Sequence, residues 1–353
     1  MESFNKREFI HKNLKHWFEE EKRIFPWRIH PTPYGVWVSE VMLQQTRAIV
    51  VIPYFERWMQ CFPTIQSLAG ASIDEVIKMW EGLGYYARAR SLHEGAQYVV
   101  SHYEGELPSD PELLKNVKGL GPYTIGAIRS FAFHQKAAAV DGNVIRVIAR
   151  LYCYEEEVDR PSAQKLIRKK VEELLPDTEP WVIMEALIEL GATICVKKPS
   201  CEKCPLQEVC QAYLLGKAKL LPKKKKRAKI ILLQRFVPVI YHKKEFLIQK
   251  QEGKKVMAGL YEFPYFEKEH TLHYFYPGKL RKIRKLQEVE HTFTRYKARL
   301  FPTVWKAKER KKVEGFIWAS IEEIQTLPFS SGHRKISKEL MEEHAEDLTY
   351  GKF

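Results

Sequence analysis

Apolar residues recur at helical spacing through most of the first 220 positions of the chain. In residues 6–24, for example, Phe9, Leu14 and Phe18 fall roughly on one side of a helix. The same periodicity predicts further helices at residues 34–46, 50–60, 72–80, 87–103, 110–117, 143–151, 162–175 and 180–194. Prolines and glycines separate these segments, and little of the region has strand character. We therefore expect a mainly α-helical region over residues 1–220.

The pattern changes after residue 220. Short stretches rich in β-branched and aromatic residues predict strands at residues 236–241, 245–250 and 289–304, and helical patterns return near 319–326 and 333–345. A run of Lys and Arg follows Pro222, which is typical of a solvated linker; a nuclear-import signal is the less favoured interpretation. The sequence thus predicts a basic linker at residues 221–232 and a small α+β domain at residues 233–353.

Composition narrows the class of protein. A chain of 353 residues suits two domains, and its 45% hydrophobic content supports a sizeable core. We find no signal peptide, and no apolar run approaches the ~20 residues of a membrane span. We therefore expect a cytoplasmic protein with no membrane partner.

The net charge of +14 is unevenly distributed. Residues 1–220 hold 28 Lys and Arg against 28 Asp and Glu, so the whole excess lies in residues 221–353. A basic surface suits a polyanion, and nucleic acid is the commonest one. A solvated basic face without a partner is the alternative, and charge alone does not separate the two.

A glycine-rich segment, Val117–Gly126, carries the first chemical signal. Gly119 and Gly121 predict a tight turn that a residue with a Cβ would resist, and Pro122 suits the first position of a new helix. The segment therefore predicts a helix-hairpin-helix at about residues 112–133. Free N–H groups at the start of the second helix suit a phosphate.

Two carboxyl groups lie in different sequence environments. Glu40 is in a helix crowded with apolar residues, so its charged form is disfavoured and its pKa is expected to rise. Asp141 follows the hairpin at the predicted start of the next helix. Such a pair can cleave a glycosidic bond if one group donates a proton and the other stabilises positive charge on the sugar. An exposed helical Glu and a plain helix N-cap are the alternative interpretations.

Most of the six cysteines crowd into one short segment, namely Cys195, Cys201, Cys204 and Cys210. In an intracellular chain such a cluster is more often a metal site than a set of disulfides. Four thiolates suit either a structural zinc ion or a 4Fe–4S cluster. Cys61 and Cys153 lie in apolar settings, and we expect them to be inert core residues.

Together these motifs resemble the endonuclease III superfamily of base-excision DNA glycosylases, in particular its adenine-removing, MutY-type branch. The hairpin with its Asp, the segment Val38–Thr46 and the four cysteines occur in family order. The resemblance covers residues 1–215 strongly and residues 230–340 more loosely. It implies a monomer that removes adenine mispaired with 8-oxoguanine or guanine in double-stranded DNA. Another glycosylase of the superfamily and a catalytically silent lesion-binding protein are the alternatives.

The resemblance also implies roles for individual residues. Glu40 is expected to protonate adenine and activate water, and Asp141 to stabilise charge at C1′ of a flipped-out nucleotide. The further implied site residues are Asn143 beside Asp141, Tyr123 near the sugar, and Trp27, Arg28 and Glu185 around the adenine. Tyr123 stands where bifunctional relatives have a nucleophilic Lys, which implies base removal without an efficient strand-cleavage step.

Other residues match family segments that contact DNA or face the opposing base. They are Gln45, Thr46, Leu83, Tyr85, Gly119 and Gly121. A polar wedge and an aromatic ring can fill the gap left by a flipped nucleotide. For Leu83, simple core packing is the alternative interpretation.

For the cysteines, the resemblance implies a 4Fe–4S cluster. The family spacing is C-x6-C-x2-C-x5-C, and this chain has one residue fewer between Cys195 and Cys201. The last three cysteines keep their spacing. We interpret the deletion as a tightened loop around a retained cluster, with structural zinc as the alternative.

The C-terminal domain resembles the MutT/Nudix-like recognition domain of the family through Gly259–Pro264. It has no Nudix box, so pyrophosphohydrolase chemistry is not expected. In the family a Phe-Ser-His loop reads 8-oxoguanine, and the corresponding residues here are Phe293, Thr294 and Arg295. Because arginine can donate two hydrogen bonds to the O6/N7 edge of guanine, we expect lesion detection with looser discrimination against plain guanine.

Overall fold

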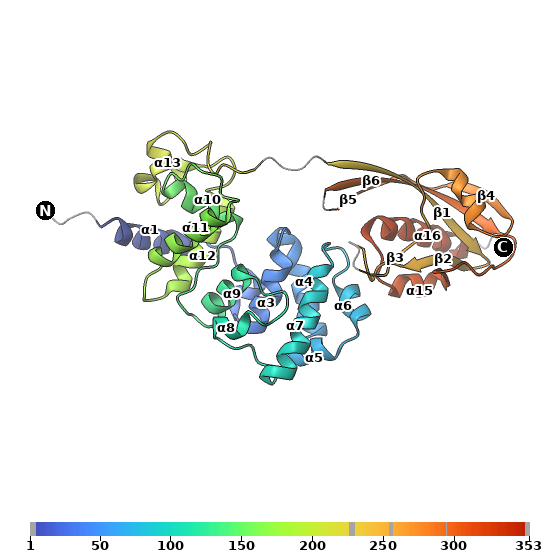
Figure 1. The fold of residues 1–353 in the computed structure, drawn as a ribbon, viewed down its shortest axis with the longest axis horizontal. Helices are drawn as coiled ribbons and strands as arrows, with labels where there is room; N and C mark the ends of the chain where they lie inside the picture. The colour runs from blue at the N-terminus through green and yellow to red at the C-terminus, as the bar shows by residue number, and fades with distance from the viewer. Residues whose placement is uncertain (1–4, 226–229, 254–256, 294, 350–353) are drawn as a thin grey trace. The chain divides into compact units, whose positions relative to one another are not determined.

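A computed structural model describes residues 5–225, 230–253, 257–293 and 295–349. The chain forms two compact units (Figure 1), one of Met1–Gly70 with Glu94–Lys226 and the other of Ala71–His93 with Arg227–Phe353. The sequence pattern places residues 71–93 in the helical region. In the structure these residues make contacts with the C-terminal domain, for example from Lys78 to Gln325 and from Asp74 to Lys250. The predicted domain boundaries stay a prediction.

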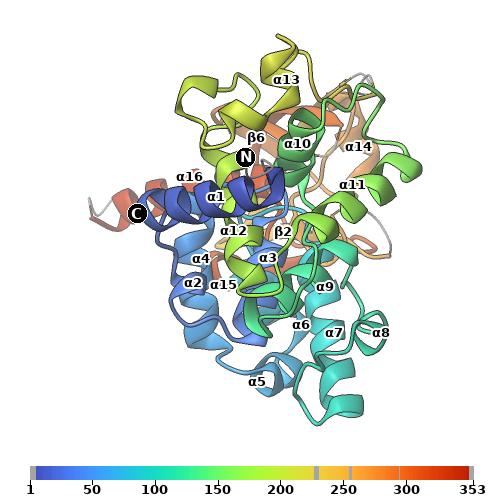
Figure 2. The same ribbon diagram turned by 90° about the vertical axis from the view of Figure 1, so that its left-hand side faces the viewer.

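The first unit is helical. Its elements are α1 (Lys6–Glu21), α2 (Pro26–Ile29), α3 (Pro33–Leu43), α4 (Ala48–Cys61), α5 (Ile65–Gly70), α8 (Pro111–Leu114), α9 (Pro122–Ala127), α10 (Gly142–Leu151), α11 (Pro161–Leu174), α12 (Pro180–Thr193) and α13 (Gln211–Leu214). Helix α7 (Ala87–Tyr103) contains the boundary between residues 93 and 94. Figure 2 shows α1 packed along α12. Helices α2 and α5 are not predicted by the periodicity, because each is too short to display a repeat.

Helix α3 lies at the centre of this unit and carries Glu40. The hydroxyl of Thr32 accepts a hydrogen bond from the N–H of Gly35 and caps the helix, and Pro33 occupies its first turn. Every residue from Tyr34 to Met42 is buried. A helix that is apolar on all sides needs such burial, so its one acidic side chain is taken out of water with it.

The predicted hairpin is present between α8 and α9. Gly119 has φ +86°, a left-handed conformation that favours glycine. Gly121 has φ −86°, and a Cβ built there meets no atom within 4 Å. The expectation that the turn requires glycine at both positions is therefore wrong for Gly121. Helix α9 continues into a π-helical turn at Ile128–Ala132.

A mixed sheet forms the centre of the second unit. The strands are β1 (Ile231–His242), β2 (Glu245–Lys250), β3 (Tyr261–Glu262), β4 (Leu280–Lys285), β5 (Val289–Phe293), β6 (Tyr296–Ala307) and β7 (Ile317–Ser320). Their order is β3-β2-β1-β6-β4, with β5 paired to β6 and β7 paired to β2. The long strands β1 and β6 run parallel, and β5 and β6 form a hairpin where the pattern predicts a single strand.

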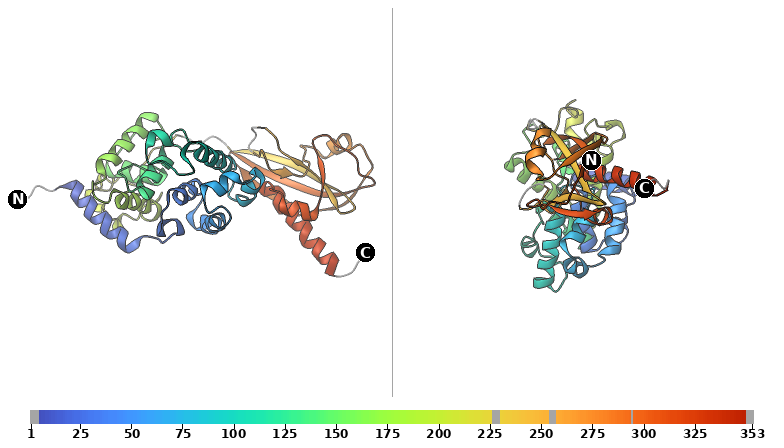
Figure 3. Two further views of the ribbon diagram at one scale, coloured as in Figure 1. Left: turned by 90° about the horizontal axis from the view of Figure 1, so that it is seen from below. Right: turned by 90° about the vertical axis from the view of Figure 1, so that its right-hand side faces the viewer.

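Alternating residues of β1 face two separate apolar cores. Val237 and Val239 pack with Ile324 of α15 (Ile321–Thr326) and Ile336 of α16 (Ser331–Thr349). Phe236 and Ile240 pack on the other side, with residues of α14 (Leu272–Phe275). Figure 3 shows α16 lying against one side of the sheet. Helix α6 (Ile73–Met79) also belongs to this unit. Among the described residues, no helix has the length and apolar character needed to span a bilayer.

Candidate active site

A cavity of about 980 Å³ opens in the first unit. Outside the cysteine segment, its lining includes every predicted site residue that belongs to the first unit in the structure, namely Trp27, Arg28, Glu40, Gln45, Thr46, Gly119, Gly121, Tyr123, Asp141, Asn143 and Glu185. These residues come from α2, α3, the turn after α3, the hairpin, α10 and α12. Folding therefore gathers segments up to 158 positions apart around one space large enough for a nucleoside.

Glu40 is nearly inaccessible, with 6% of its surface exposed. The hydroxyl of Tyr123 donates a hydrogen bond to its Oε2. Burial raises the pKa of Glu40 to about 7, although the Tyr123 hydrogen bond and the charge of Arg28 act in the opposite direction. The prediction of a raised pKa is confirmed. A carboxyl with this pKa is protonated in about half of the molecules at neutral pH, so it can serve as a general acid.

Asp141 is held in a different way. It caps α10, and its Oδ1 accepts hydrogen bonds from the N–H groups of Asn143 at 2.9 Å and Val144 at 2.8 Å. The side-chain amide of Asn143 donates to Oδ2 at 2.7 Å. Burial raises the pKa of Asp141, and these three hydrogen bonds oppose the rise. They also fix the direction of the carboxylate of Asp141, a residue that lines the cavity.

Two of the residues that the resemblance implies around adenine, Arg28 and Glu185, belong to a partly buried ion network. Arg28 lies 3.7 Å from Glu185 and donates a hydrogen bond to Glu189 at 2.9 Å, and Arg23 also binds Glu189. Burial alone would raise the pKa of Glu189, but the bonds from Arg23 and Arg28 hold it below its usual value. Burial raises the pKa of Glu185. The ring of Trp27 stacks on Phe25 with centroids 4.9 Å apart.

Glu189 and Arg23 are residues that the sequence analysis missed. Glu189 lies one helical turn after Glu185 on the otherwise apolar α12, and that spacing was the available signal. Arg23 lies in the loop after α1, where no pattern distinguishes it from other surface arginines. Both line the cavity.

The residues expected to enter the duplex differ in exposure. Gln45 is exposed and has φ +59°, an uncommon conformation for a residue with a Cβ. In the second unit, Tyr85 is 44% exposed with φ +50°, whereas Leu83 is only 7% exposed. Leu83 thus has the burial of a core residue, and Tyr85 is the side chain that this loop offers to a ligand.

Two of the three predicted lesion-reading residues can be placed in the structure, where β5 ends and β6 follows. Phe293 is the last residue of β5, and Thr294 lies outside the described residues. Arg295 is exposed, and its guanidinium lies 5.5 Å from the centroid of the Tyr296 ring. Within the described part of the turn, the Arg295 side chain therefore serves no packing role in a core.

The four clustered cysteines line one pocket together with Arg150. Arg150 is 2% exposed and donates hydrogen bonds to Sγ of Cys195 at 3.3 Å and to the carbonyl of Val196 at 2.7 Å. Burial raises the pKa of the Cys204 thiol to about 12, so a thiolate there needs a positive partner. Within the described ranges, no group of three or more Cys, His, Asp or Glu is arranged to hold a metal ion. The structure therefore does not separate a 4Fe–4S cluster from structural zinc at these four cysteines.

The two remaining cysteines differ from expectation. Cys61 is exposed at the end of α4, and Cys153 is partly exposed. The prediction that both are core residues is wrong for Cys61, because the end of the amphipathic α4 turns it toward solvent.

Comparisons with known proteins agree with this architecture. Residues 38–177 match the HhH-GPD superfamily base excision DNA repair proteins, and residues 236–339 match the NUDIX domain. A solved thermostable thymine-DNA glycosylase is 27% identical, with a TM-score of 0.55 over 60% of this chain and 97% of its own. A solved endonuclease III–DNA complex shares the fold at 23% identity and a TM-score of 0.51 over 62% of this chain and 98% of its own. The fold and the matched domains define a helix-hairpin-helix protein of base excision repair that carries a Nudix-type second domain.

Curated relatives identify the branch. The adenine DNA glycosylase of Buchnera aphidicola from Baizongia pistaciae is 31% identical over 288 residues, which span 80% of this chain and 82% of that protein. The rat adenine DNA glycosylase is 43% identical over 212 residues, which span 57% of this chain. The chain matches only 41% of the length of the rat protein. The chain belongs to the adenine DNA glycosylase family.

Proposed function

We propose that this protein is a monofunctional glycosylase that removes adenine mispaired with 8-oxoguanine or guanine. The observation that carries the proposal is Glu40, a buried carboxyl with a pKa of about 7 that shares one cavity with Tyr123 and Asp141. The names of the relatives support adenine as the base. A base within a duplex is out of reach of such a cavity, so the nucleotide must be flipped out first.

The proposed reaction uses the two carboxyls in turn. Protonated Glu40 transfers its proton to a ring nitrogen of adenine, and the N-glycosidic bond then breaks with its electron pair leaving on the base. Asp141 stabilises the positive charge that develops at C1′ of the sugar. Water adds to C1′ as Glu40 takes up one of its protons. The products are free adenine and an abasic site, and both carboxyls return to their initial states.

The residues around the cavity support hydrolysis rather than strand cleavage. Tyr123 has no amine that could form a Schiff base with C1′, and none of the described residues lining the cavity is a lysine. Lys118, on the other side of the hairpin glycines, forms a surface ion pair with Glu94. We therefore expect base removal without an associated lyase step.

Recognition of adenine is assigned to the buried ion network and the nearby aromatic ring. Arg28 and Glu185 offer hydrogen-bonding groups to the polar edge of the base, and Trp27 offers an apolar surface. Glu189 and Arg23 hold Arg28 in place. The hairpin and the turn with Gln45 and Thr46 would contact the DNA backbone and the disrupted base step.

We propose that Cys195, Cys201, Cys204 and Cys210 hold a 4Fe–4S cluster. When bound, the cluster ties residues 195–210 together and so contributes folding energy to this loop-rich segment. Arg150 supplies a buried positive charge next to the thiolates. Four iron atoms and four sulfides per purified chain, with broad visible absorbance, would support the cluster, whereas one zinc ion in a colourless protein would contradict it.

Double-stranded DNA is the proposed partner, bound by a monomer in the cytoplasm. The positive excess in residues 221–353 supports a polyanionic ligand. Phe293, Thr294 and Arg295 are assigned to reading the base opposite adenine, with Tyr85 from the separate loop at residues 82–85.

The test is single-turnover excision on three short duplexes that carry adenine opposite 8-oxoguanine, guanine or thymine. Each reaction is analysed with and without alkali. We expect strand breaks only after alkali, with the fastest reaction opposite 8-oxoguanine. Breaks without alkali would contradict the monofunctional mechanism, and no excision on any duplex would favour the silent lesion-binding protein.

A further inference from the structure

The loop with Tyr85 is built into the second unit, although it precedes the hairpin in sequence. Residues Ala71–His93 form a compact unit with Arg227–Phe353. This segment contains α6, the loop at residues 82–85 and the start of α7. Something must therefore fasten the loop to the Nudix-like domain.

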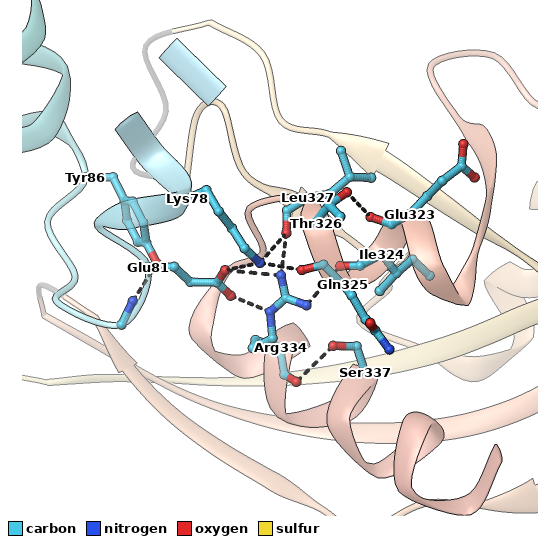
Figure 4. Close-up of polar contacts among 11 residues, drawn as sticks. Lys78, Glu81, Tyr86, Glu323, Ile324, Gln325, Thr326, Leu327, Arg334 and Ser337 are labelled. Atoms are coloured by element: carbon cyan, nitrogen blue, oxygen red, sulfur yellow. Dashed lines mark hydrogen bonds and ion pairs between the residues drawn. The ribbon is translucent and has the colours of Figure 1, made fainter. Parts of the chain in front are cut away.

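Glu81 and Arg334 make the most enclosed of the contacts that do so. Arg334 lies in the first turn of α16, and its side chain is 12% exposed against 13% for Glu81. Nε of Arg334 donates to Oε1 of Glu81, and Nη2 donates to Oε2 at 3.1 Å (Figure 4). This two-pronged geometry is the most directional form of an arginine–carboxylate pair.

Neighbouring groups form further hydrogen bonds with Arg334 and a second ion pair with Glu81. Arg334 also donates to the carbonyl oxygens of Ile324 at 2.9 Å and of Leu327. The ammonium of Lys78 lies 3.0 Å from Glu81 and donates to the carbonyl of Gln325 at 2.5 Å (Figure 4). The carboxylate therefore meets two positive charges, and the guanidinium bridges α15, α16 and the end of α6.

Two further contacts secure the flanks of the segment. On one side of the loop, Lys250 binds both carboxylate oxygens of Asp74 at 2.8 Å. On the other side, Arg90 donates to the carbonyl of Ala258 at 2.6 Å. These contacts are more exposed than the central pair: the side chains of Lys250 and Asp74 are 36% and 44% exposed.

The loop itself has a backbone that needs support. It directly follows Glu81, and Gly82, Gly84 and Tyr85 have φ of +105°, +71° and +50°. Arg88 donates to the carbonyls of Leu83 at 3.2 Å and Gly84 at 3.1 Å. A positive φ at a residue with a side chain, such as Tyr85, persists only where the surrounding structure holds the backbone in place. Such strained residues are common at ligand-binding sites. A shift of Glu81 would be transmitted directly to the loop.

We propose that the Glu81–Arg334 pair is a specificity-determining clamp: it fastens the Tyr85 loop to α15 and α16, so that Tyr85 is held in place to act on the base opposite adenine. The proposal rests on the proposed function. Glu81 and Arg334 are positioning residues, because they act through Tyr85. Loss of the clamp should reduce discrimination between opposing bases while leaving the chemistry in the first unit intact.

The experiment compares single-turnover excision of adenine opposite 8-oxoguanine and opposite guanine. For Arg334→Met we expect the ratio of the two rates to fall at least fivefold, while the rate opposite guanine stays within a factor of two of the native rate. Glu81→Gln, which retains the shape of the side chain, should give the same change. Arg334→Lys keeps the charge without the two-pronged geometry and should give an intermediate ratio. Arg310→Met is the matched control, because Arg310 pairs with Glu245 at 3.0 Å elsewhere in the same unit.

A double-mutant cycle with Tyr85→Ala separates positioning from general destabilisation. If the clamp acts through Tyr85, Arg334→Met should change the ratio little once Tyr85 is removed. The proposal would be overturned if native protein, Arg334→Met and Glu81→Gln had the same ratio of excision rates. Fully additive effects in the cycle would overturn it as well. Should Arg334→Met fail to fold, Glu81→Gln and Arg334→Lys decide in its place. Absence of excision by the native protein would instead reject the proposed function.

Discussion

At the scale of single residues, the cavity surrounds its two candidate catalytic carboxyls differently. Glu40 is almost fully desolvated and has one hydrogen-bond donor, Tyr123, so its pKa is raised to about 7. Asp141 is also desolvated, but two backbone N–H groups and the Asn143 amide stabilise its charged form. A group that holds a proton and a group that keeps its charge are what glycosidic hydrolysis requires.

Replacing Glu40 by Gln should abolish excision without abolishing DNA binding. The amide keeps the size of the side chain and its acceptor for Tyr123, but it has no proton of suitable acidity, so we expect a loss of more than about 100-fold. Single-turnover rates and a binding assay on the same lesion duplex measure the two effects. Glu112→Gln, at an exposed carboxylate, serves as the control. Unchanged excision by Glu40→Gln would remove Glu40 from the mechanism.

The raised pKa of Glu40 also predicts a pH dependence. The acid form is lost as pH rises through about 7, so the excision rate should fall there. The folded state binds this proton more tightly than the unfolded state, in which the Glu40 carboxyl has its ordinary pKa of 4.5. The free energy of unfolding of the native protein therefore falls as the pH rises from 4.5 to about 7. Glu40→Gln is always neutral and should therefore be more stable than native protein at pH 8, by on the order of 3 kcal/mol, and little different at pH 4. Denaturant unfolding at the two pH values tests this difference, and an equal difference at both would contradict it.

Arg295 provides a test of base reading. Restoring the family residue with Arg295→His should increase the ratio of excision rates opposite 8-oxoguanine and guanine, since arginine can also bond the O6/N7 edge of plain guanine. We expect a change of several-fold, on the scale of ~1 kcal/mol of discrimination. Lys308→His, at another exposed basic residue of the same domain, controls for the charge change. An identical ratio for native protein and Arg295→His would show that residue 295 does not read the base.

At the scale of elements, the close approach of α10 and α12 organises the cavity. A Cβ on Gly191 of α12 would come within 2.6 Å of the Cβ of Asn143, so only glycine permits the observed contact. That contact supports the side chain that orients Asp141, and α12 also carries Glu185 and Glu189. One helix thus positions both the side of the cavity proposed to bind adenine and the side proposed to face the sugar.

Gly191→Ala should push α12 away from Asn143. We expect the free energy of unfolding to fall by about 1–3 kcal/mol through overpacking, and the excision rate to fall with it because Asp141 loses its orientation. Gly70→Ala is the matched control, since a Cβ on Gly70 meets no atom within 4 Å. Thermal unfolding and single-turnover excision measure both effects. If Gly191→Ala kept the free energy of unfolding and the excision rate of the native protein, α10 and α12 could move apart without cost.

At the scale of the whole molecule, the proposed function divides chemistry and recognition between the two units. All cavity-lining residues lie in the first unit, and Tyr85, Phe293 and Arg295 lie in the second. The positive charge also belongs mainly to the second part of the chain. Excision and choice of opposing base should therefore be separable by truncation.

A chain ending at residue 225 should retain part of its excision activity and lose preference for 8-oxoguanine. It should also bind DNA with a weaker dependence on salt, because fewer phosphate contacts release fewer counterions. Measurements of Kd over a range of salt concentrations and the ratio of excision rates test both expectations. Full preference in the truncated chain would contradict the assignment of recognition to residues 227–353, which form the larger part of the second unit.

The sequence by itself determined those features whose signals are local. Helical periodicity, the Gly119 turn and the Asp141 cap depend on residues within a few positions of each other, and the structure contains all three. The short strands β3 and β7 were missed, because two to four residues cannot display a period. Buried Glu40 could be proposed from its apolar neighbours in α3, since a helix without a polar face has to be buried.

Only the tertiary structure decided which distant residues meet. The Arg23–Glu189 pair joins positions 166 apart, and the Glu81–Arg334 pair joins positions 253 apart. Such pairs leave no periodic trace, because each partner alone looks like an ordinary surface charge. The same limit applies to residues 71–93: their helical pattern is local, whereas their contacts with the C-terminal domain depend on residues far away in the chain.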